Sequence, residues 1–129
     1  MKKLLTIFFL FSLLFINHCS KNEKIEIVEI KEDQIEAQML NAYQEGIVAF
    51  ENQLYIEAAK KFNEAEILFP QSEWAPRSAL MAAYSYFYDD YNNRAISELL
   101  NFFKKYPNHP STSYAHYLLA MSYYNEIVD

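Results

Sequence analysis

The chain of 129 residues is poor in the residues that make turns and cross-links, with one glycine, four prolines and one cysteine. So little glycine leaves no glycine-rich loop to hold a phosphate, and too few turn residues for a hairpin-rich β fold. The lone Cys19 excludes an internal disulfide and a metal cluster held by several thiolates. Basic residues number 11 against 17 acidic ones, and they form no basic stripe. A nucleic acid is therefore not an expected partner.

The sequence also lacks the residue spacings of a catalytic or metal site. His109 and His116 lie seven residues apart, and neither belongs to a Glu-x-x-His or His-x-x-x-His pattern. No serine has a base placed beside it to activate it. Glu64 and Glu66 form a charge cluster that we interpret as solvent-exposed helix surface. We expect no catalytic residues, no metal and no cofactor, and a hydrolase is the least favoured class.

Apolar residues, by contrast, are abundant. They make up 52% of the chain, and aromatic residues alone make up 17%. This composition is not that of a disordered chain, which cannot bury enough apolar surface to fold. Because the apolar positions recur at helical spacing, the sequence predicts an all-α fold.

One segment of the chain recurs after 37 residues. The clearest correspondences pair small, bulky and helix-ending residues: Ala58 with Ala95, Phe62 with Leu99, and Pro70 with Pro107. A recurrence of this length is typical of helical solenoids, and Ala-x-x-x-Phe followed by proline is the tetratricopeptide pattern. Small residues at Gly46, Ala83 and Ala120 occupy the position at which the paired helices approach each other closely.

We therefore predict a tetratricopeptide-like solenoid of helical hairpins over residues 35–129, with about two and a half repeats. The expected helices span residues 35–51, 55–69, 73–88 and 93–105, and a last helix begins at Ser111 after Pro110. Because the last helix has no partner, we interpret the chain as a fragment truncated at its C-terminus, and the alternative is that a partner covers the exposed edge. The alternative to a solenoid is a non-repetitive helical bundle.

The first 18 residues have the features of a bacterial lipoprotein signal peptide. Two lysines precede an apolar run of 13 residues, Leu4 to Ile16, which is too short to cross a bilayer comfortably. Ile16-Asn17-His18-Cys19 resembles the box that precedes a lipidated cysteine, and Ser20 favours sorting to the outer membrane. We predict lipidation at Cys19 and a flexible tether over residues 19–34. An ordinary signal peptide with an incidental cysteine is the alternative.

A groove is the expected functional surface. In tetratricopeptide arrays the first helix of each hairpin lines the concave side, and fixed offsets from the small residues select the side chains that face it. Rigid aromatic rings supply contact area at low entropic cost, and an arginine can bind a carboxylate. The candidate peptide-binding residues are Tyr43, Arg77, Tyr84, Phe87, Tyr117 and Tyr124. Alternatively, some of these rings pack between helices, and Arg77 pairs with Glu73.

Three motifs give the repeats a family resemblance. They are the Phe-Pro-x-Ser segment at Phe69–Ser72, the aromatic run at Ala83–Tyr88, and the Tyr-Pro-Asn-His-Pro loop at Tyr106–Pro110 followed by Tyr114–Tyr117. With these motifs, residues from about 35 to the end resemble the BamD family, lipoproteins of the outer-membrane β-barrel assembly machinery.

The resemblance implies a non-enzymatic subunit that is lipid-anchored at the periplasmic face of the outer membrane. It implies binding of the C-terminal signals of unfolded outer-membrane proteins, which end in an alternating strand with a terminal aromatic residue and a free carboxylate. It also implies scaffolding, with the barrel-forming subunit and accessory lipoproteins as partners. The alternative is another envelope tetratricopeptide lipoprotein, a scaffold for pilus or secretin assembly or for cell-division coordination.

Overall fold

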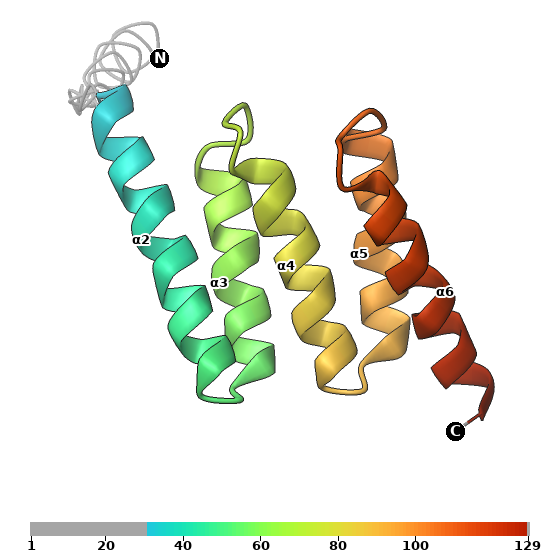
Figure 1. Cartoon of the computed structure of the whole chain (residues 1–129). Coiled ribbons are helices and arrows are strands. Elements are labelled where there is room, and N and C mark those ends of the chain that lie inside the picture. The colour runs from blue at the N-terminus through green and yellow to red at the C-terminus, as the bar shows by residue number, and fades with distance from the viewer. Residues whose placement is uncertain (1–30, 129) are drawn as a thin grey trace, which may run out of the picture.

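The computed structural model describes residues 31–128, which form five helices and no strand (Figure 1). The helices are α2 (Glu32–Glu51), α3 (Tyr55–Leu68), α4 (Ala75–Tyr88), α5 (Asn92–Lys105) and α6 (Thr112–Val128). Each helix runs antiparallel to the next and packs against it. The predicted all-α array of helical hairpins is confirmed. The predicted signal peptide, the lipidation site Cys19 and the tether up to residue 30 lie outside the described residues.

Two helix starts differ from the sequence prediction by more than one residue. Helix α2 begins at Glu32, so the last three residues assigned to the tether are helical; Glu32 and Asp33 suit the positive end of the helix dipole. Helix α4 begins at Ala75, two residues later than predicted, because the Ala75 amide donates to Ser72 Oγ at 3.2 Å in a turn. None of the helices between residues 31 and 128 combines the length and apolar character needed to cross a membrane.

The structure repeats with the 37-residue period of the sequence. Helices α3 and α5 begin at Tyr55 and Asn92, and α4 and α6 begin at Ala75 and Thr112. The turns inside the hairpins match as well: Gln53 has φ 62° and Asp90 has φ 58°. Corresponding backbone bonds follow these residues, from Leu54 N to Ala49 O (2.9 Å) and from Tyr91 N to Tyr86 O (3.0 Å).

Small residues stand where the helices of a hairpin meet. A methyl group on Gly46 would lie 2.8 Å from ring carbons of the buried Phe62. One repeat later, Ala83 is fully buried in the core cluster that contains Leu99. Ala120 holds the equivalent position in α6 and is exposed. The close approach predicted at Gly46 and Ala83 is therefore present.

Helix α2 closes its edge of the array with polar side chains. One face of α4 carries small, buried residues, Ala75, Ser78 and Ala82, and Ala82 shares a core cluster with Ala58 and Phe62 of α3. One period earlier, α2 carries the exposed residues Gln38, Asn41 and Glu45 at these positions. A polar outer face is what a capping element of a solenoid needs, since no helix of residues 31–128 covers it.

The prediction that Glu66 lies on a solvated surface is wrong. Its side chain is 7% exposed, and its Oε1 accepts hydrogen bonds from Lys105 Nζ and Tyr106 Oη, both at 2.8 Å. The repeat brings the ends of α3 and α5 together there, and a buried carboxylate requires such partners. Burial, and then the neighbouring Glu66, raises the pKa of the Tyr106 phenol. Glu64 is exposed, as expected, and pairs with Lys61 at 3.1 Å.

Candidate functional site

Helices α2, α4 and α6, together with the first residue of α3, bring aromatic rings together on one face. The ring of Phe50 stacks on Tyr84, with centroids 5.5 Å apart and planes 17° apart. Tyr84 lies 6.4 Å from Tyr114, and Tyr114 lies 6.3 Å from Tyr117. Tyr55 and Tyr88 extend this chain of rings on the side of the hairpin turns. We call the group the aromatic strip: Phe50, Tyr55, Tyr84, Tyr88, Tyr114 and Tyr117.

The aromatic strip is open to a ligand. Tyr114 is 44% exposed and Tyr117 is 60% exposed, while Tyr84 is half-buried between them and Phe50. Hydrogen bonding with Tyr88, and then burial, raises the pKa of Tyr84, and burial raises the pKa of Tyr114. These phenols are therefore neutral at physiological pH and can both donate and accept hydrogen bonds.

A second group of side chains lies nearer the start of α4. The guanidinium carbon of Arg77 lies 5.1 Å from the centroid of the Trp74 ring. Trp74 in turn meets Tyr43 edge to face at 5.1 Å, and Tyr43 meets the buried Phe62 at 5.3 Å. Burial raises the pKa of Tyr43, and the charge of Arg77 acts in the opposite direction. Arg77 therefore sits on a column of rings that reaches the core.

Arg77 itself is exposed. None of the ion pairs formed within residues 31–128 includes it, so the alternative pairing with Glu73 is not formed there. A cation stacked on one aromatic ring keeps the N–H groups at its edge available. This guanidinium is therefore placed to receive a carboxylate.

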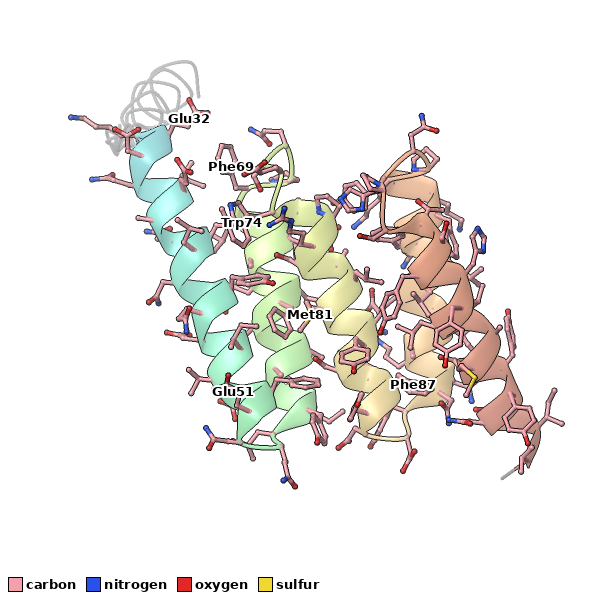
Figure 2. All side chains as sticks on the ribbon, in the orientation of Figure 1. Glu32, Glu51, Phe69, Trp74, Met81 and Phe87 are labelled. Carbon is pink, nitrogen blue, oxygen red and sulfur yellow. The ribbon has the colours of Figure 1, made fainter. Side chains whose placement is uncertain are left out.

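Four of the six predicted groove residues belong to the two groups described above. Tyr43 and Arg77 belong to the column of rings, and Tyr84 and Tyr117 belong to the aromatic strip. Phe87 is partly buried and packs against the core clusters that contain Leu99 and Ala95, which leaves less of its ring for a ligand (Figure 2).

The remaining predicted residue, Tyr124, is 61% exposed near the end of α6. Sequence reasoning missed Trp74, although its position three residues before Arg77 is the spacing at which side chains meet on a helix. In Figure 2, Trp74 lies at the N-terminal end of α4 and Phe87 near its C-terminal end.

Two open grooves lie elsewhere, along the outer side of the α2–α3 hairpin. Their volumes are about 410 and 330 Å³, and both are lined by Glu45 and Lys61, which form an ion pair of 2.7 Å. No group of three or more His, Cys, Asp or Glu residues within 31–128 is arranged to hold a metal ion. The aromatic face thus remains the main candidate for binding.

The helical-hairpin fold and the aromatic strip together define a helical-repeat protein of the tetratricopeptide type with an exposed aromatic surface. A family model described as "YfiO: Outer membrane lipoprotein" matches residues 35–129. The chain belongs to this family of outer membrane lipoproteins.

Curated relatives point the same way. The chain is 41% identical over 73 residues to the outer membrane protein assembly factor BamD of Caulobacter vibrioides, covering 57% of this chain and 24% of the relative. It is 34% identical over 97 residues to BamD of Rickettsia prowazekii, covering 75% and 39%. It is 36% identical over 72 residues to BamD of Neisseria gonorrhoeae, covering 56% and 27%.

The chain thus spans about a quarter to two fifths of the length of these curated relatives. No solved structure matches it significantly.

Proposed function

We propose that this chain is a non-enzymatic subunit for assembling outer-membrane β-barrel proteins, and that it recognises the C-terminal signals of unfolded clients. Its relatives carry the name outer membrane protein assembly factor, which favours this role over pilus, secretin or cell-division scaffolding. The observation that carries the proposal is the aromatic strip together with Arg77, which lies on α4, the helix that carries Tyr84.

The mode of binding follows from the chemistry of the aromatic strip and of Arg77. A client end is an extended strand, so alternate side chains point to one side. Its apolar and aromatic side chains lie against Tyr84, Tyr114 and Tyr117, whose rings are rigid and already packed on one another. Its terminal carboxylate pairs with Arg77, the exposed guanidinium over Trp74.

The second half of the proposal is scaffolding. The lipid on Cys19 holds the repeats at the periplasmic face of the outer membrane, beside the barrel-forming subunit and accessory lipoproteins. The family's description as outer membrane lipoproteins supports the anchor. A tethered receptor raises the effective concentration of its binding face near the membrane-bound partners.

Peptide binding tests the aromatic face. The double variant Tyr84→Ala plus Tyr117→Ala should weaken binding of a client C-terminal peptide at least about fivefold, since stacked aromatic contacts are each worth roughly 0.5–1.5 kcal/mol. Fluorescence anisotropy with a labelled peptide measures the affinity. Tyr91→Ala is the matched control, because Tyr91 is 59% exposed but outside the strip. Unchanged affinity in the double variant would reject the face.

Fractionation tests the anchor. Cys19→Ser should leave the precursor uncleaved or release the protein from membranes into the periplasm, because no other cysteine of the chain can be acylated. Immunoblots of membrane and soluble fractions report both outcomes. If the variant is processed normally and stays in the membrane fraction, Cys19 is not the anchor.

A further inference from the structure

We infer that Trp74 and Arg77 fix the direction in which a bound chain end lies. Its terminal carboxylate lies at the N-terminal end of α4, and its preceding residues lie along the aromatic strip. The inference rests on the proposed function and adds a polarity and a register to it. It follows from the positions of the two groups along one helix.

The cation is held in place by its stacking. Trp74 is partly buried against the core cluster of Met39, Ala42 and Ala65, and it also meets Tyr43. With its face over such a fixed ring, the guanidinium of Arg77 keeps less rotamer freedom than an exposed arginine, so less is lost when it binds. Trp74 therefore acts as a positioning residue, and Arg77 contacts the ligand.

The spacing along α4 gives the register. Arg77 and Tyr84 are seven residues apart, which is about 10 Å along a helix axis. An extended chain advances about 3.3 Å per residue, so it covers this distance in about three residues. With the carboxylate at Arg77, the side chain read by Tyr84 belongs to a residue about three positions before the last one.

The opposite direction is disfavoured by charge. Tyr84 and Tyr114 offer phenol groups whose pKa values are raised, and no cation of residues 31–128 belongs to the strip. A terminal carboxylate placed there loses its hydration without gaining a positive partner, which is costly. The bound chain consequently runs antiparallel to α4.

A peptide series tests the inference on the chain of 129 residues. Short serine- and threonine-rich peptides carry one terminal phenylalanine and a second one moved through the preceding positions, each as free acid and as amide. We expect the free acid to bind about tenfold more tightly than the amide. We expect affinity to peak when the second phenylalanine lies about three residues before the last.

Two variants separate contact from positioning. Arg77→Ala should abolish the preference for the free acid and hardly change binding of the amide. Trp74→Leu should reduce that preference while the positive charge remains, and Trp74→Phe should restore most of it, because the ring is kept. Since Trp74 also packs in the core, thermal melts confirm that each variant is folded, and the acid-to-amide ratio does not depend on the folded fraction.

The outcomes distinguish this inference from the proposed function. Binding that requires Tyr84 and Tyr117 but ignores the terminal charge, or that is equal for every position of the second phenylalanine, overturns the direction and leaves the function standing. An unaltered acid preference in Trp74→Leu removes the positioning role. Failure of the wild-type protein to bind any peptide of the series rejects both.

Discussion

At the scale of single residues, the turns inside the hairpins store a small strain. Gln53 and Asp90 occupy the left-handed region, with φ of 62° and 58°. Side chains with a Cβ are disfavoured there, and neither residue is glycine. The strain recurs at the same point of both repeats, so the turn geometry dictates it and the local sequence does not.

Gln53→Gly should therefore stabilise the protein. Removing the Cβ relieves the left-handed strain, and the net gain in the free energy of unfolding is about 0.5–1 kcal/mol after the added freedom of the unfolded chain is counted. Urea unfolding followed by circular dichroism measures it.

Asn52→Gly provides the matched control for this turn. Asn52 has φ −83°, and its side-chain amide donates to Val48 O at 2.8 Å, so glycine there should destabilise. Equal effects of the two substitutions would contradict the assignment of strain to Gln53.

At the scale of elements, the helices are held by a few close contacts that recur along the array. Ala83 lies at such a contact: it is fully buried with Leu99, Phe102 and Leu118 around it, at the junction of α4, α5 and α6. Ala120 holds the same repeat position but is exposed. The two alanines form a natural pair of buried and open sites.

Ala83→Leu should destabilise the fold by about 1–3 kcal/mol, the usual cost of overpacking a tight contact. Ala120→Leu adds the same atoms where they meet solvent and should change stability by less than about 0.5 kcal/mol. Thermal melts of the two variants and the parent give the comparison. A melting temperature that does not fall for Ala83→Leu would contradict the packing described at this junction.

The ends of α3 and α5 are joined by a polar contact that has a pH dependence. Because the pKa of Tyr106 is raised above its ordinary value of 10.0, the folded state keeps the phenol proton to higher pH than the unfolded chain does. The contribution of this raised pKa to the free energy of unfolding is complete below about pH 10 and is lost as pH rises through and beyond this value.

Tyr106→Phe should lower the free energy of unfolding by about 1 kcal/mol at neutral pH, because Glu66 loses one of its two donors. It should also flatten the decline in stability above pH 10. Urea titrations across this range test both effects, with Tyr91→Phe as a control on an exposed tyrosine. An unchanged slope would show that other groups cause the alkaline loss.

Much at this scale could be predicted from the sequence, because local rules decide it. The prolines, the small residues and the 37-residue period placed every helix start within three residues of its position. The burial of Glu66 could not be predicted, because it depends on Lys105 and Tyr106, which lie 39 and 40 residues further on. A charge cluster on a helix is usually exposed, and only tertiary packing reverses that expectation.

At the scale of the whole molecule, the sequence predicted part of the aromatic face that forms the candidate site. Fixed offsets from the small residues selected Tyr84 and Tyr117. They succeed because the repeat period places side chains at equivalent positions of the first helices of successive hairpins on one face of the array. They also selected Phe87, whose ring is largely taken up by packing between helices. The support of Arg77 by Trp74 depends on the turn before α4, and no repeat rule describes that turn.

The order of packing along the chain has a consequence for motion. Each helix packs on its neighbours in sequence, and within residues 31–128 α4 lies at the centre of the row, with α2 and α6 at its edges. In such a quasi-one-dimensional array, edge units open at lower free energy than central ones. Arg77 and Tyr84 are carried by α4, whereas Phe50 and Tyr117 are carried by the edges. Within residues 31–128 the proposed binding face therefore has a rigid centre and adjustable margins, which would allow chain ends of different bulk to fit against the same cation.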